Sequence, residues 1–286
     1  MNTRHEILHP LIVLGLFAFA PTFASAATYY IAPSGSNYDP GTQSAPFATP
    51  QKAHDIANPG DTIYMRGGTY YLPTQTTLTR DGTSGKRIQL FAFPGEKPII
   101  DGANQPNGGH AAVIKMTSAS WWHIKGLELR NGPVDGIFSE GNSSNNIFEQ
   151  LNIHHMGRLA AGGAQGTGLL LYRNGGNNLI LNNDVHDNED QLSFGGGANG
   201  INLVTSGTGN IIRGNRAWCN SDDGFDMWNS SPALIENNWV WDSGRGIDCR
   251  ATGGTGHGLK LGGKAPNDGG HTLKNNVSWK NKVDGF

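Results

Sequence analysis

The sequence has few charged residues, few cysteines and no long stretch with the period of an amphipathic helix. Charged residues make up 15% of the chain and the formal net charge is -2, so a basic surface for nucleic acid is not expected. The chain has only two cysteines, Cys219 and Cys249, which excludes a small fold held by several disulfides. The sequence is compatible with one disulfide between them and also with two buried free thiols. Because 36% of residues are hydrophobic, the low charge indicates a folded chain and not a disordered one.

The N-terminus has the pattern of a secretory signal peptide over residues 1–26. Arg4 precedes an apolar run over residues 11–20, and Ala24-Ser25-Ala26 has the small residues of a cleavage site. The apolar run is too short to span a bilayer and none like it follows, so we expect no membrane anchor. We expect a secreted protein, in the periplasm or outside the cell.

A degenerate repeat predicts an all-β fold. A glycine followed by alternating apolar residues recurs at 136–138, 168–171, 200–203, 224–227 and 258–261. Alternation is typical of short strands with one buried face, and stacked repeats of this kind form a solenoid. We therefore predict a parallel β-helix. Between these phrases Asn183, Asn215, Asn238 and Asn276 recur at one repeat position, where stacked amides would stabilise a bend and carry no catalytic role.

The chain divides by pattern into two parts after the signal peptide. Residues 27–100 contain two expected strands, 29–32 and 61–65, and a short helix within 46–57, which would cap the open end and form the first coils. Residues 101–286 would form the coils that carry the catalytic groove. The last residues, Asp284-Gly285-Phe286, start another strand phrase, so we expect that C-terminal coils are missing.

The alternation also predicts a site. If Phe225 and Leu259 point inward, then Asp226 and Lys260 point outward, and Asn202 takes the same position one coil earlier. At the bends before these strands stand Asn199, Asp222 and Asp223. Three close carboxylates favour a hard cation, and calcium fits better than zinc. Two simpler interpretations are a solvated turn at 222–224 and an ordinary salt bridge between Lys260 and Asp226.

We expect Asn202 to bind substrate, and further candidates for substrate binding lie near the groove. Arg245 and Arg250 could hold substrate carboxylates through paired hydrogen bonds, although such arginines are more often solvated. His257 precedes the Lys260 strand and could face the groove. The column Trp218, Trp241 and Trp279 is expected to be a packing stack and not a sugar platform.

Two motifs resemble a known family. The segments Asn220-Ser221-Asp222-Asp223-Gly224-Phe225-Asp226 and Gly256-His257-Gly258-Leu259-Lys260-Leu261-Gly262-Gly263, with the opening 30–36, resemble polysaccharide lyase family 9, which contains secreted pectate lyases. The resemblance implies a right-handed parallel β-helix, Ca²⁺ ligands at Asp222, Asp223 and Asp226, and Lys260 as the catalytic base. Asn199 stands where the family has a fourth aspartate ligand, so one negative charge is lost.

We therefore expect a calcium-dependent pectate lyase that cleaves an acidic polysaccharide by β-elimination. Partners other than the polysaccharide are not expected, and the chain should act as a monomer. Two other classes stay open: a β-helix glycoside hydrolase, which would use two carboxyl groups, and a non-catalytic carbohydrate-binding solenoid. The repeats alone do not distinguish among uronide substrates or between endo and exo action.

Overall fold

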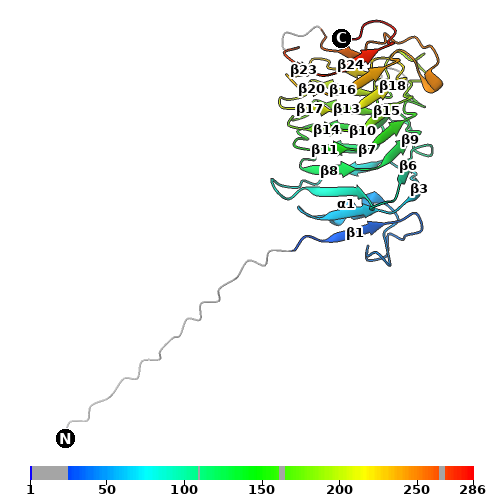
Figure 1. Cartoon of the computed structure of the whole chain (residues 1–286). Helices are drawn as coiled ribbons and strands as arrows, with labels where there is room; N and C mark the ends of the chain where they lie inside the picture. Colours follow the sequence, from blue (N-terminus) through cyan, green and yellow to red (C-terminus); the bar gives the residue numbers. More distant parts are fainter. Residues whose placement is uncertain (2–24, 109, 161–164, 264–267) are drawn as a thin grey trace.

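Three parallel β-sheets stack into one elongated solenoid, as the ribbon in Figure 1 shows. The computed structural model describes Met1 and residues 25–108, 110–160, 165–263 and 268–286. Most of the expected signal peptide, residues 2–24, lies outside this part of the chain. The prediction of an all-β parallel β-helix is confirmed.

From β2 to β22 the coils contribute one strand to each sheet, in the order A, B, C; β1 adds a strand to sheet A alone, and β23 and β24 add strands to sheets A and B. Sheet A has nine strands: β1 (Thr28–Ile31), β2 (Thr62–Met65), β5 (Ile88–Ala92), β8 (Trp122–Lys125), β11 (Ile147–Glu149), β14 (Leu179–Leu181), β17 (Ile211–Arg213), β20 (Leu234–Glu236) and β23 (Thr272–Lys274). Sheet B has eight: β3 (Gly68–Tyr71), β6 (Pro98–Asp101), β9 (Glu128–Arg130), β12 (Asn152–His154), β15 (Asp184–His186), β18 (Arg216–Trp218), β21 (Trp239–Trp241) and β24 (Val277–Trp279). Sheet C has seven: β4 (Thr76–Leu78), β7 (Ala112–Thr117), β10 (Asp135–Glu140), β13 (Leu169–Tyr172), β16 (Ile201–Val204), β19 (Phe225–Asp226) and β22 (Leu259–Lys260).

The repeated glycine phrases are the strands of sheet C from β10 to β22. The glycine is required because the chain passes close to the next coil at that point. A Cβ on Gly224 would lie 2.7 Å from the carbonyl oxygen of Gly258, which is closer than a side chain tolerates. The phrase therefore marks where each coil enters sheet C.

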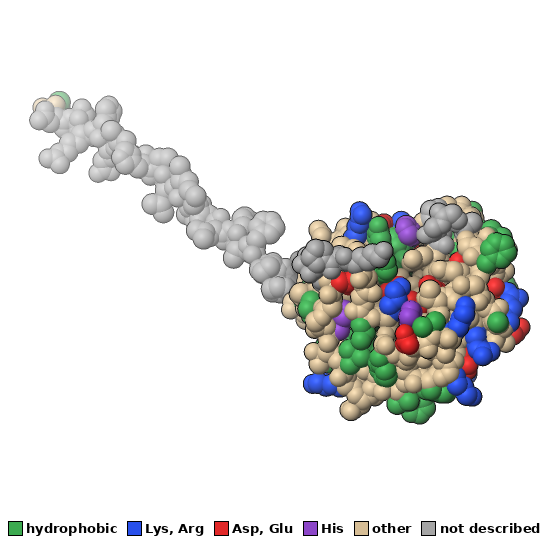
Figure 2. All heavy atoms as spheres, turned by 90° about the horizontal axis from the view of Figure 1, so that it is seen from above, with side chains coloured by type: hydrophobic (Ala, Val, Ile, Leu, Met, Phe, Trp, Pro, Cys, Tyr) green, Lys and Arg blue, Asp and Glu red, His purple; other side chains and the backbone are tan. Residues whose placement is uncertain are grey.

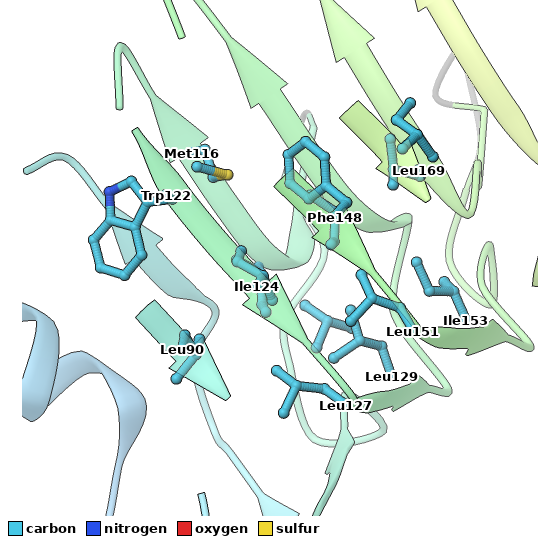
Figure 3. Packing of buried hydrophobic residues seen from close by; sticks show 14 of the residues in the cluster. Leu90, Met116, Trp122, Ile124, Leu127, Leu129, Phe148, Leu151, Ile153 and Leu169 are labelled. Carbon is cyan, nitrogen blue, oxygen red and sulfur yellow. The ribbon is translucent and has the colours of Figure 1, made fainter. Parts of the chain in front are cut away.

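The interior is filled by the inward side chains of all three sheets. Figure 3 shows Ile124 and Phe148 from sheet A facing Leu129 and Ile153 from sheet B, and these four side chains are completely buried. Because the period of a strand is two, every second residue is fixed inside and its neighbours are fixed outside. The core therefore sets which side chains face solvent along the whole stack.

The asparagine column forms a buried ladder along one bend, as predicted. The Oδ1 atom of Asn215 accepts from the backbone N–H of Asn183 at 2.9 Å and from its Nδ2 at 2.8 Å. Asn215 Nδ2 donates to the carbonyl of Ile180 at 2.9 Å and to Asn238 Oδ1 at 3.1 Å. Each amide thus pairs the turn backbone with the next coil.

The aromatic column on the outer face of sheet B is also a packing stack, as predicted. The rings of His154, His186, Trp218, Trp241 and Trp279 follow one another with centroid separations of 5.0, 4.1, 4.9 and 4.8 Å. Their faces cover each other, so they are not free to stack on sugars.

The N-terminal part of the described chain contains an α-helix. Helix α1 (Pro50–Ile56) starts after Thr49, whose hydroxyl accepts from the Lys52 N–H, and it packs against β1 and β4. A short 3₁₀ turn, η1 (Ile247–Cys249), lies in the loop before β22. Neither helix is long and apolar enough to cross a bilayer. The division at residue 100 stays a prediction.

The end view of the stack shows hydrophobic side chains between scattered charges (Figure 2). Among the exposed apolar residues of the last part of the chain are Val277 and Val283, with exposed fractions of 49% and 51%.

We predict that Asn215→Ala lowers the free energy of unfolding by about 2–4 kcal/mol, because it leaves several buried polar groups without partners. Urea denaturation followed by circular dichroism measures this change. Asn104→Ala, at an exposed position in the loop after β6, is the matched control and should have almost no effect. A loss below about 0.5 kcal/mol for Asn215→Ala would show that the ladder does not stabilise the stack.

Candidate active site

The expected column lies on the outer face of sheet C. Asn202 is paired with Asp226, and Asp226 with Lys260, on adjacent parallel strands. The residues before them, Ile201, Phe225 and Leu259, are paired in the same way and completely buried. The predicted placement of Asn202, Asp226 and Lys260 is therefore confirmed.

Lys260 lies between two carboxylates. Its Nζ atom donates to Asp223 Oδ2 and to Asp226 Oδ2, both at 3.1 Å. The Trp228 ring centroid lies 5.0 Å from the same atom. Trp228 is two residues beyond Asp226, so the alternation that predicted Asp226 also points Trp228 outward.

The loop before β22 holds the carboxylates of Asp222 and Asp223. The backbone N–H and the hydroxyl of Thr255 lie 2.7 and 2.8 Å from Asp222 Oδ1, and the hydroxyl lies 2.9 Å from Asp223 Oδ1. The backbone N–H of His257 donates to Asp223 Oδ1 at 2.8 Å. Thr255 lies in a glycine-rich segment without alternation, so no sequence pattern indicates its role.

A disulfide fixes this loop to the end of β18. Cys219 is bonded to Cys249, a pairing that the sequence left open. Cys219 is three residues before Asp222, and Cys249 is six residues before Thr255. The bridge therefore ties the loop that holds the carboxylates to the coil that supplies them.

Two oxygen atoms in the column have no hydrogen-bond partner within the described residues. They are Asp226 Oδ1 and Asn202 Oδ1, both buried and on paired residues of neighbouring strands. Asn202 Nδ2 donates to Gln165 Oε1 at 3.2 Å, which leaves the Asn202 oxygen for another donor or a cation. Buried oxygens without donors are costly, and a hard cation would satisfy both.

Asn199 has a different environment. Its Oδ1 accepts from the backbone N–H of Asp223 at 2.9 Å, which fixes the orientation of the amide. Its Nδ2 has no partner among the described residues and cannot bind a cation. The oxygen keeps one lone pair, so a ligand role of Asn199 stays a prediction; the geometry offers Asn202 as a further oxygen donor.

The ionisation of the site follows from burial and from the close charges. Burial raises the pKa of Asp226 to about 7, although Lys260 opposes the shift. Burial and the charge of Asp223 raise the pKa of Asp222. Burial alone would lower the pKa of Lys260, but Asp226 and Asp223 outweigh it, so this pKa is raised. Without a further cation, Lys260 therefore keeps its proton.

The site borders a cavity of about 370 Å³. The residues that line it are His110, Gln165, Leu170, Tyr172, Asn202, Val204, Asp222, Asp226, Trp228 and Lys260. His110 and Gln165 come from loops, and the sequence did not single them out.

Three expected substrate-binding residues are not part of this lining. Arg250 donates to Glu189 at 2.6 Å, and Arg245 lies 3.5 Å from Asp242. The ring of His257 lies 3.8 Å from Asp284, and only its backbone contacts the site. Substrate contacts by Arg245, Arg250 and His257 stay predictions, which the cavity geometry does not support.

The similarity to known proteins agrees with the fold. The family described as "Pel9A-like, right handed beta helix region" matches residues 29–286. The pectate lyase PEL9 of Emericella nidulans is 32% identical over 95% of this chain and 72% of its own length. The pectate lyase L of Paenibacillus polymyxa is 33% identical over 94% of this chain and 61% of its own length.

Solved structures give the same result. The crystal structure of the pectate lyase Pel9A superposes with a TM-score of 0.77 at 29% identity, over 92% of this chain and 66% of that one. A rhamnogalacturonan lyase superposes with a TM-score of 0.79 at 27% identity, over 90% of this chain and 69% of that one. The class of protein is thus that of the polysaccharide lyases. The chain belongs to the Pel9A-like family of right-handed β-helices.

We predict that the stability of the cation-free protein falls as the pH rises from about 4 to about 7, because the folded pKa of Asp226 lies above its unfolded value. The proton is held more tightly in the fold, so the stabilisation is complete below pH 4 and is lost through pH 7. Asp226→Asn should lack this component. The measurement is the melting temperature in a chelator across this pH range; parallel curves for both proteins would contradict the prediction.

Proposed function

We propose that this chain is a calcium-dependent pectate lyase that cleaves α-1,4-linked galacturonan by β-elimination, with Lys260 as the base. The observation that carries the proposal is the position of Lys260 between Asp223 and Asp226, beside Asp226 Oδ1 and Asn202 Oδ1, which have no partner among the described residues. Relatives named pectate lyases support the substrate class.

The residues present fit a calcium ion. Asp222, Asp223 and Asp226 supply carboxylate oxygens, and Asn202 or Asn199 supplies an amide oxygen, which is the type of ligand set that calcium prefers. When bound, calcium would stabilise the negative charge that develops on the substrate carboxylate. Burial raises the pKa values of Asp222 and Asp226, and a bound cation would favour their charged forms.

Lys260 would remove the proton from the carbon next to the substrate carboxylate. The electron pair of that C–H bond forms a double bond to the next carbon, where the glycosidic C–O bond breaks. The departing oxygen keeps the C–O bonding pair and takes a proton from water. A lysine base must be neutral when it acts. Once Asp223 and Asp226 share their charge with a cation, they hold the Lys260 proton less tightly, which favours the neutral amine.

We also infer that the protein works in an oxidising compartment outside the cytoplasm. The signal-peptide pattern of residues 1–26 and the Cys219–Cys249 disulfide both support this location.

We predict that Ca²⁺ raises the melting temperature and that Asp223→Ala removes this rise, because an ion bound only by the folded site stabilises it. Isothermal titration calorimetry measures the affinity directly. Asn199→Asp should bind Ca²⁺ more tightly because it adds a carboxylate. Asp39→Ala, in the loop before α1, is the control. Unchanged affinity in Asp223→Ala and Asn199→Asp would place the ion elsewhere.

We predict that Lys260→Ala lowers the rate of β-elimination by roughly 10²–10⁴, the usual effect of removing a general base. Lys260→Arg keeps the positive charge but stays protonated, so it should be equally slow. The assay follows the ultraviolet absorbance of the unsaturated product from polygalacturonate with Ca²⁺.

Two results would contradict the assignment of Lys260. One is a Lys260→Arg protein with most of the wild-type rate. The other is a rate optimum near pH 4–5, roughly the range of a carboxylic acid, which would favour a hydrolase that uses the aspartates. A lysine base requires a rate that rises with pH.

A further inference from the structure

A second cavity lies on a different face of the solenoid, on the outside of sheet A near the N-terminal coils. Its volume is about 340 Å³, and it shares none of its described lining residues with the cavity of the candidate active site. Tyr64 from β2, Phe91 from β5 and Phe93 form its aromatic lining. Tyr64 and Phe91 are paired on adjacent strands and point away from the core, since their neighbours Ile63 and Leu90 are buried.

The aromatic rings of this cavity are not stacked on one another. Every ring pair that includes Tyr64 or Phe91 is tilted or edge-on, with interplanar angles of 31, 59, 77 and 85°. In the aromatic column on sheet B the successive rings are nearly parallel, at 5 to 14°, so they cover each other. Tyr64 and Phe91 are half-buried, and ring surface is therefore left for a ligand in the cavity.

Two positions with little side chain adjoin in the lining. Ala92 and Gly126 follow the paired residues Phe91 and Lys125 on adjacent strands. A Cβ on Gly126 would lie 3.0 Å from the Cβ of Ala92, so the two positions are direct neighbours. Gln150, from the next coil, lines the cavity as well. A hollow of this volume with aromatic and polar groups has the dimensions of a small-ligand site and not of a protein interface.

The charged groups of the lining are paired. Glu96 and Lys125 are the charged residues among the described lining. Glu96 accepts from Arg66 at 2.7 to 2.9 Å, and Lys125 Nζ lies 2.9 Å from Glu149. Lys97 follows Glu96 but is exposed outside the lining, where solvent screens its charge. The cavity therefore has no net charge of its own.

An uncharged pyranose ring fits these groups. The C–H groups of such a ring pack on an aromatic surface, and its hydroxyls donate and accept hydrogen bonds at the edge. The side chain of Gln150 is exposed, and its amide can do both. A carboxylate would compete with Glu96 and Glu149 for cations that are already paired, so it would gain little. A lipid surface would contact apolar groups that protrude, whereas these rings are half-buried in a hollow.

We propose that the cavity formed by Tyr64, Phe91 and Gln150 binds an uncharged pyranose residue of a glycan chain. This site is on sheet A and the candidate active site is on sheet C, so a glycan bound here leaves the cavity beside Lys260 open. The inference does not rest on the proposed lyase function, because it concerns binding without cleavage.

Isothermal titration calorimetry of the wild-type protein in a chelator tests the site. The probes are the hexasaccharides of β-1,4-linked glucose and of β-1,4-linked galactose, and the hexamer of galacturonate is the charged comparison. We expect at least one uncharged hexasaccharide to bind with a Kd of about 1 mM or lower, and more tightly than the galacturonate hexamer.

Variants assign the binding to the aromatic rings. Phe91→Leu keeps an apolar side chain but removes the flat ring, so it should weaken binding by about threefold to tenfold. Phe91→Tyr keeps the ring and should bind like the wild type. Tyr71→Leu, at an exposed position on sheet B, is the matched control. Trp228→Ala changes the cavity beside Lys260 and should leave this affinity unchanged. Tyr64→Leu is the second test if Phe91→Leu has a lowered melting temperature.

Weaker binding in Phe91→Leu, with unchanged binding in Tyr71→Leu and Trp228→Ala, supports the site whether or not the protein cleaves any polymer. The absence of binding for both uncharged hexasaccharides at millimolar concentration would overturn it. So would loss of binding in Trp228→Ala alone, or tighter binding of the galacturonate hexamer that depends on Phe91. Co-sedimentation with phosphatidylcholine vesicles that Phe91→Leu abolishes would assign the rings to a lipid surface instead.

Discussion

The in-register stacking of parallel strands is the constraint on which the rest of this structure depends. Buried residues such as Ile201, Phe225 and Leu259 occupy the same place in successive coils. Because strand side chains alternate, the residues beside them must leave the core at equivalent points. Groups that are 24 and 34 residues apart in the sequence thereby become neighbours on adjacent strands.

The site uses this rigid arrangement to hold charges that would otherwise separate. Asp222 and Asp223 sit at a bend, and Asp226 on a strand, so a core that packs well keeps them close together. The cost is visible in the raised pKa of Asp226 and in its Oδ1 atom, which has no hydrogen-bond partner in the part of the chain that the structure describes. Shifted pKa values of this kind are typical of functional sites, where the charges that function requires lower the stability of the fold.

The cavity beside Lys260 joins two kinds of surface on the outer face of sheet C. Its charged end carries Asp226 and Lys260, and its apolar end carries Leu170 and Tyr172. Both arise from the same outward positions of consecutive coils. Substitution at a single outward position can therefore change specificity without changing the fold.

The sequence by itself determined the solenoid, the asparagine ladder and the column of Asn202, Asp226 and Lys260. These follow from the two-residue period and from repeats, which are local and need no knowledge of distant loops. The tertiary structure alone decided the role of Thr255, the pairing of Cys219 with Cys249, and the partners of Arg250. These depend on loops of unequal length between the coils, whose contacts join residues 30 to 61 positions apart and follow no repeat.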